Sequence, residues 1–183
     1  MRSAALITAE DFELVAQVLG PCELVRGEIV PMSLGGIQDS QVTMNAARLL
    51  DSHVRPLKIG RVLTGEAGVI VARRPDTVRG ADVAFISYQR LPKGVSGHGF
   101  LQQPPELVIE VLSKDTSWTK MEEKVADYHA MGVDLVWVLD PQTVTLRAYP
   151  RGEAPLLLHE ADPANADPHV PGFAVAVSAF FED

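Results

Sequence analysis

A charged residue lies inside one of the most hydrophobic segments of the chain. Residues 106–112 (ELVIEVL) are apolar at most positions, a pattern typical of a strand buried on both faces. Because side chains alternate in a strand, Glu110 shares one face with Val108 and Leu112. A carboxylate among such neighbours is costly unless a metal ion, a lysine or an arginine meets it. Glu110 therefore predicts a functional or ionic site.

The other hydrophobic patterns predict helices and strands in a mixed order. An apolar stripe, begun by a capping signal at Thr8 and ended by Gly20-Pro21, predicts a helix over residues 8–19. We expect further helices at about residues 41–53, capped by Asp39 or Ser40, and at 119–131, after a capping box of Thr119 and Glu122. Strands are predicted at residues 22–25, 28–32, 61–72, 78–86, 106–112, 135–139 and 143–149.

The order of these elements predicts one α/β domain over residues 1–183, a mixed sheet flanked by helices. An N-terminal helix and hairpin and several short strands after residue 151 are expected as additions to it. The segment 87–105, with its glycines and a Pro104-Pro105 pair, is a long connection, and such connections often shape a site.

Two further charged residues fall on apolar faces. Asp82 lies inside the predicted strand 78–86, on the same face as Ala84 and Ile86. Lys124 lies three or four residues from Met121 and Tyr128 on the helix 119–131, so it belongs to the face that should pack on the sheet. The neighbouring Glu122 and Glu123 should face elsewhere.

These residue types together predict metal-dependent hydrolysis of a phosphodiester. Two inward carboxylates from neighbouring strands, Asp82 and Glu110, can bind Mg²⁺ (or Mn²⁺) through oxygen and leave positions for water. Such a metal lowers the pKa of a bound water and offsets phosphate charge. The ammonium of Lys124 can orient that water or stabilise developing charge.

Structural alternatives stand beside this hypothesis. Asp82 could begin a strand and accept a hydrogen bond from a loop amide, and Glu110 could form only a buried ion pair with Lys124. Lys124 alone could be a helix lysine whose ammonium reaches solvent. A direct Glu110–Lys124 bond in a closed, dry pocket would favour the non-catalytic alternative. An open cleft on which both carboxylates converge would favour an enzyme.

Composition narrows the classes of function. A formal net charge of −8 argues against a protein that coats nucleic acid non-specifically, but a nuclease with a local basic rim remains compatible. The single cysteine, Cys22, excludes an internal disulfide and a cysteine-based zinc site, and fits a reducing cytoplasm. No apolar run reaches the length of a membrane span, and no signal peptide is expected, so we predict a cytoplasmic protein.

A set of runs along the chain is distinctive when taken together: RGADVAFI at 79–86, QRLP at 89–92, PELVIEVLS at 105–113, Lys124, Tyr128, Gly132-Val133, VWVLDP at 136–141 and PGF at 171–173. With these runs the chain resembles the Uma-type restriction endonucleases of bacteria, a branch of the PD-(D/E)XK nuclease superfamily. The resemblance covers most of the chain, from about residue 23 to residue 181.

The resemblance implies a restriction-endonuclease-like fold and Mg²⁺-dependent cleavage of DNA. By position, Asp82 and Glu110 match the acids of the family motif, while the position of its lysine is Leu112 here. That role falls instead on Lys124 from the following helix. Cleavage of both strands needs two sites, so a homodimer is expected. The alternative is a non-catalytic module on the same fold that binds nucleic acid or a protein.

Three other acids are left open at this stage. Asp39 stands where the family commonly has a histidine, and we expect it to cap the second helix rather than to bind metal. Glu28 and Glu66 are possible further acids of the site.

Overall fold

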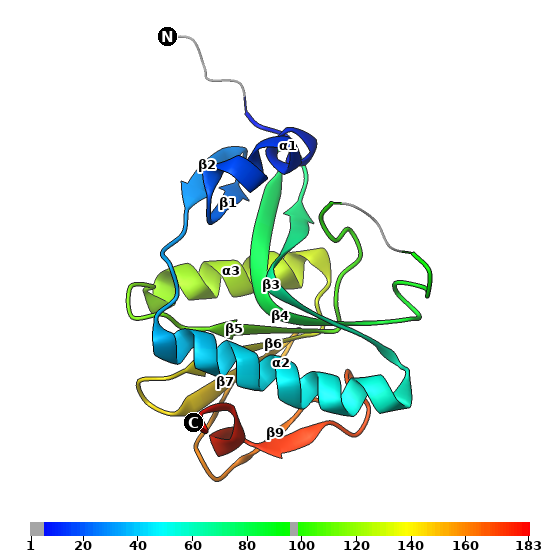
Figure 1. The fold of residues 1–183 in the computed structure, drawn as a ribbon, viewed down its shortest axis with the longest axis vertical. Helices are drawn as coiled ribbons and strands as arrows, with labels where there is room; N and C mark the ends of the chain where they lie inside the picture. Colours follow the sequence, from blue (N-terminus) through cyan, green and yellow to red (C-terminus); the bar gives the residue numbers. More distant parts are fainter. Residues whose placement is uncertain (1–5, 96–98) are drawn as a thin grey trace.

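A mixed sheet of eight strands forms the centre of the protein, in a computed structural model that describes residues 6–95 and 99–183 (Figure 1). Its strands are β1 (Cys22–Val25), β2 (Glu28–Pro31), β3 (Gly60–Ala72), β4 (Thr77–Ser87), β5 (Leu107–Val111), β6 (Leu135–Asp140), β7 (Thr145–Pro150) and β8 (Leu156–Leu158). They run in the order β2-β1-β4-β5-β6-β7-β8, and β3 pairs with β4. The neighbours β5 and β6 are parallel and the other pairs are antiparallel.

The helices and a small second sheet complete the fold. The helices are α1 (Ala9–Leu19), α2 (Ile37–Leu57), α3 (Trp118–Met131) and the 3-10 helix η1 (Val177–Phe180); the second sheet pairs β9 (Pro163–Asn165) with β10 (Ala174–Ala176). Within residues 6–95 and 99–183, no helix has both the length and the apolar character needed to cross a membrane. The predicted fold class, a mixed sheet flanked by helices, is confirmed.

Two helix starts differ from the prediction. Helix α2 begins at Ile37 rather than near residue 41, because Asp39 accepts a hydrogen bond from the Gly36 amide (3.0 Å) and closes the first turn from inside the helix. Helix α3 begins one residue earlier than expected. Its cap is Ser117, whose hydroxyl accepts from the Lys120 amide, so the capping box predicted at Thr119 is wrong.

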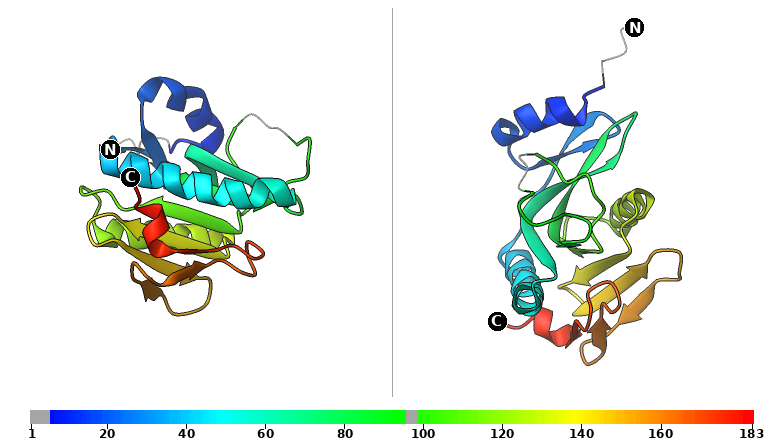
Figure 2. Two further views of the ribbon diagram at one scale, coloured as in Figure 1. Left: turned by 60° about the horizontal axis from the view of Figure 1, so that its bottom comes forward. Right: turned by 90° about the vertical axis from the view of Figure 1, so that its right-hand side faces the viewer.

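The two faces of the sheet have different covers (Figure 2). Helix α3 joins the parallel strands β5 and β6 and packs on one face, where Met121, Val125 and Tyr128 meet Val108 and Leu112. Helix α2 and the C-terminal segment cover the other face. The predicted alternation is confirmed: Val108 and Leu112 face α3, and Ile109 faces α2. Glu110 therefore points toward α3.

The N-terminal helix and hairpin are tied to the turn between β3 and β4. Asp76 accepts hydrogen bonds from the Ala9 amide (2.8 Å), at the start of α1, and from Arg73 (2.9 Å). Strand β1 pairs with β4 at Leu24 and Val78. This pairing brings Glu23, the preceding residue of β1, over the part of β4 that leads to Asp82.

Candidate active site

The two predicted carboxylates lie opposite each other on neighbouring strands. In the antiparallel pair of β4 and β5, Val83 aligns with Ile109, so one step further Asp82 faces Glu110. Next to this position a side chain takes the place of a backbone acceptor between the two strands: Oδ2 of Asp82 accepts a hydrogen bond from the Val111 amide at 2.7 Å. The alternative interpretation of Asp82 is therefore correct in one respect. The carboxylate does bind a backbone amide, but within the sheet rather than at the start of a strand.

Lys124 reaches this pair from α3, as its helical spacing predicts. Its Nζ lies 2.7 Å from Oε2 of Glu110, 2.7 Å from the carbonyl oxygen of Gly80 and 3.2 Å from Oε1 of Glu23. The exposed fractions of the Lys124 and Glu110 side chains are 13% and 3%. Both neighbouring acids are exposed, and Glu122 faces away from the site as expected, whereas Glu123 lines the same pocket as Lys124.

Glu110 has a second partner on the same helix. The Tyr128 hydroxyl donates to Oε1 of Glu110 at 2.7 Å, so each carboxylate oxygen receives a hydrogen bond from α3. Burial nevertheless raises the pKa of the Glu110 carboxyl to about 8, and nearby Asp82 adds to the rise. The burial of Lys124 would lower its pKa, but the carboxylates of Glu110, Glu23 and Asp82 raise it above the ordinary value. Lys124 is therefore a permanent cation and not a general base at neutral pH.

A second ionic pair supports the first. Oε2 of Glu23 accepts from Arg79 at 2.7 Å and its Oε1 accepts from the Gly80 amide at 3.0 Å. Arg79 also binds Asp127 of α3 at 2.7 Å. Burial alone would raise the pKa of Glu23, but Lys124 and Arg79 lower it, so this carboxylate stays ionised. Glu23 thus links β1, β4 and α3 around Lys124.

A bulge in β3 turns another acid over the site. The register between β3 and β4 shifts between Thr64 and Ala67, and the two intervening residues, Gly65 and Glu66, have φ of 81° and 59°. Such bulges re-aim a side chain, and they occur often beside active sites. Oε2 of Glu66 lies where a Cβ on Gly80 would approach it to 2.7 Å, so a side chain at this point of β4 would displace the Glu66 carboxyl.

Glu66 lies beside Asp82 and lines the same pocket. Although Glu66 is exposed as a residue, its carboxyl faces inward. Burial and the neighbouring Asp82 raise its pKa to about 7. Burial likewise raises the pKa of Asp82. Burial and the neighbouring acid thus disfavour full ionisation of both carboxyls.

These side chains open onto a pocket of about 650 Å³. Asp82, Glu110, Lys124, Glu66 and Glu23 lie on its polar side, and the strand β2, the loop after it and helix α2 supply an apolar side. The site is therefore open, but Glu110 and Lys124 are directly bonded. The open pocket favours an enzyme, whereas the direct Glu110–Lys124 bond favours the structural ion pair.

The donor set fits a hard divalent cation. In residues 6–95 and 99–183, no three His, Cys, Asp or Glu side chains are arranged as a ready metal cluster. Magnesium, however, is usually bound by one or two carboxylates with waters and substrate phosphate. The Asp82 and Glu110 carboxyls, which face each other across β4 and β5, satisfy that need, and Glu66 lines the same pocket.

Of the two remaining acids considered in the sequence, Asp39 lies at the pocket and Glu28 does not. Asp39 accepts the Gly36 amide from within the first turn of α2, so it takes part in capping but not as the residue that precedes the helix, and it also lines the pocket. Glu28 is exposed on the edge strand β2 and is not brought to the pocket. Glu23 was missed in the sequence. It is an acid in the otherwise apolar strand CELV, the same kind of signal that singled out Glu110.

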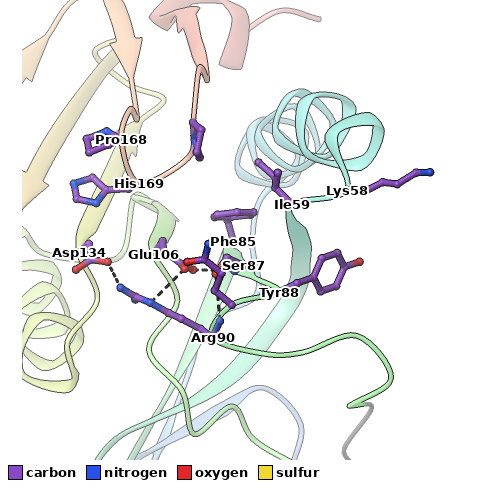
Figure 3. A pocket seen from close by; sticks show the side chains of 12 residues that line it. Lys58, Ile59, Phe85, Ser87, Tyr88, Arg90, Glu106, Asp134, Pro168 and His169 are labelled. Atoms are coloured by element: carbon purple, nitrogen blue, oxygen red, sulfur yellow. Dashed lines mark hydrogen bonds and ion pairs between the residues drawn. The ribbon is translucent and has the colours of Figure 1, made fainter.

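A second cavity, of about 590 Å³, lies at the other ends of β4 and β5 (Figure 3). Figure 3 shows Arg90 between Asp134 and Glu106, with both of which it forms ion pairs. Its guanidinium also donates to the carbonyl oxygens of Pro104 and Pro105. Glu106 in turn accepts the Ser87 amide. This network fixes both ends of the 87–105 connection, and none of its described residues lines the pocket that holds Asp82 and Glu110.

Comparison with known proteins agrees with this architecture. The structure is similar to a crystal structure from Anabaena variabilis that is titled a putative nuclease belonging to DUF820. Its TM-score is 0.80 and its identity 20%, over 96% of this chain and 97% of that one. At that identity the similarity shows a shared fold. No curated protein matches the chain.

The fold is thus that of the restriction-endonuclease-like class. The Uma2 family model, described as "Putative restriction endonuclease", matches residues 9–178. The chain belongs to the Uma2 family, and the family assignment expected from the sequence is confirmed. Family and fold together support a nuclease.

Proposed function

We propose that the protein is a Mg²⁺-dependent (or Mn²⁺-dependent) DNA endonuclease. One observation supports this most: the Asp82 and Glu110 carboxyls meet across β4 and β5 beside the Lys124 ammonium, at the wall of an open pocket. Asp82 and Glu110 would hold the cation. The cation, when bound, supplies charge neutralisation for the phosphate and a more acidic water.

The other groups have roles that follow from their partners. Lys124 stays protonated, so it can donate an N–H to a phosphate oxygen or to the attacking water, and it cannot take a proton from that water. Tyr128 fixes the orientation of Glu110 by donating to Oε1. The apolar side of the pocket excludes water from one side of the reacting group, which strengthens these charge interactions.

Cleavage of both strands of a duplex requires two sites. A homodimer would supply them by symmetry. A monomer would be a nickase, and the two forms are separated by whether linear product accumulates together with nicked circles or after them.

The test is the nicking of supercoiled plasmid during a titration with MgCl₂ or MnCl₂. The wild type should convert the plasmid in a metal-dependent way, and Glu110→Gln and Asp82→Asn should not. Glu122→Gln is the matched control, since it removes an exposed acid from α3 and should keep the activity. If Glu110→Gln nicks as fast as the wild type, the proposed site is wrong.

A second candidate function is a non-catalytic binding module on this fold. It is favoured by the direct Glu110–Lys124 bond, which can hold the buried charges without any metal. The net charge of −8 also favours it. In that case calorimetry would detect no binding of Mn²⁺, and the plasmid would stay supercoiled at every metal concentration.

A further inference from the structure

We propose that Glu23 is a positioning residue of this site, which holds the Lys124 ammonium over β4 when Glu110 turns to a divalent cation. The inference rests on the proposed function, because it concerns the state in which the cation is bound. It gives a role to an acid that neither the family motif nor the sequence pattern assigned.

Lys124 is held at the site by three oxygens. Its Nζ donates hydrogen bonds to Oε2 of Glu110 and to the Gly80 carbonyl, each at 2.7 Å, and it forms an ion pair with Oε1 of Glu23 at 3.2 Å. To turn one of these hydrogen-bonded donors toward a phosphate or a water, Lys124 must release a contact.

The contact to be released is the one with Glu110. Glu110 is a proposed ligand of the cation, and a cation held by its carboxylate would repel the ammonium bonded to the same group. The Gly80 carbonyl belongs to β4 and cannot follow a moving side chain. Lys124 then needs another anion close by, or it becomes a buried charge without a counter-charge.

Glu23 is fixed in the place where that anion is needed. Arg79 and the Gly80 amide hold its two oxygens at 2.7 and 3.0 Å, and its side chain is only 9% exposed. Arg79 is itself held by Asp127. Glu23 therefore stays in position while Glu110 changes partner, and the longer 3.2 Å contact with Lys124 can shorten.

The test measures Mn²⁺ binding by isothermal titration calorimetry, with no nucleic acid present. In Glu23→Gln, the cation must displace Lys124 from Glu110 without an anion to receive it, so we expect binding to weaken about tenfold. Asp127→Asn is the matched control. It removes one charge from the same ionic network but has no contact with Lys124, and it should weaken binding less than about threefold.

A double-mutant cycle with Lys124→Met isolates the contact. Lys124→Met should tighten Mn²⁺ binding, because the competing ammonium is gone. In that background Glu23→Gln should weaken binding no more than Asp127→Asn does. Equal effects of Glu23→Gln with and without Lys124 would overturn the proposal, because Glu23 would then act by its charge alone.

A conservative variant covers the case in which Glu23→Gln fails to fold. Glu23→Asp keeps the charge but withdraws the carboxylate from Nζ, so it should weaken Mn²⁺ binding if contact matters. Wild-type affinity in Glu23→Asp would overturn the proposal. A wild type that binds no Mn²⁺ would refute the metal site of the proposed function as well, whereas normal wild-type binding with an unaffected Glu23→Gln refutes only the role of Glu23.

Discussion

Tyr128 donates its hydroxyl hydrogen to Oε1 of Glu110 at 2.7 Å, in the buried layer between α3 and the sheet. Tyr128→Phe keeps the ring and removes this donor from a buried carboxyl. The free energy of unfolding, measured by urea denaturation, should fall by about 2 kcal/mol. Tyr88→Phe is the control. Its ring lies under Lys93 at 4.7 Å in the second cavity, and loss of its hydroxyl should change stability by less than about 0.5 kcal/mol. Equal losses in the two variants would contradict the prediction.

The raised pKa of Glu110 predicts how stability depends on pH. Burial raises this pKa from 4.5 to about 8, so the native state binds the proton more tightly than the unfolded chain does. The contribution of Glu110 to stability is therefore fully present below the unfolded value of 4.5 and declines as pH rises to about 8.

The measurement compares wild type with Glu110→Gln, which cannot titrate, by urea denaturation across this pH range. The stability of the wild type relative to the variant should fall as pH rises. A difference that stays constant with pH would mean that Glu110 is ionised throughout, as a simple ion pair with Lys124 requires.

Gly80→Ala tests the position of Glu66. The backbone of Gly80 lies outside the left-handed region, so alanine is tolerated there, but its Cβ would meet Oε2 of Glu66 at 2.7 Å and displace that carboxyl. Mn²⁺ binding should weaken a few-fold if Glu66 contributes charge to the site. In the Glu66→Gln background, Gly80→Ala should have no further effect. If Gly80→Ala weakens Mn²⁺ binding equally with and without Glu66→Gln, the cause is a distortion of strand β4 and not the displacement of Glu66.

Lys120 is an exposed cation at the mouth of the pocket, one turn before Lys124. Lys120→Gln should weaken binding to duplex DNA, measured in Ca²⁺ by fluorescence anisotropy, without preference for sequence. The slope of log K against log salt should fall by about 0.9, the value for one phosphate contact. Lys93→Gln, in the exposed segment beside the second cavity, should leave the slope unchanged.

Local patterns were sufficient for much of the architecture. The period-two alternation that placed Glu110 among Val108 and Leu112 also determined which face meets α3, and the helical spacing of Lys124 and Tyr128 placed both on the covering face. Both signals depend only on neighbours within a few residues, so they can be recognised without knowledge of the fold.

Glu23 and Glu66 could not be placed in this way. The contact between Glu23 and Lys124 joins residues far apart in the chain, and it depends on the pairing of β1 with β4. Glu66 faces the site because the bulge at Gly65 breaks the alternation from which a face is inferred. The start of α2 was misplaced for a similar reason, since exposed Ile37 suggested no helical face.

The Asp82 carboxylate also takes the place of a backbone carbonyl in the sheet, because it accepts the hydrogen bond of the Val111 amide. A lineage that abandoned nuclease activity would still be under selection to keep Asp82, or an asparagine, for folding alone. Glu66 closes no strand pair by its side chain, so it would be free to vary in that lineage. An intact acid at position 82 is thus a poor marker of activity among related sequences.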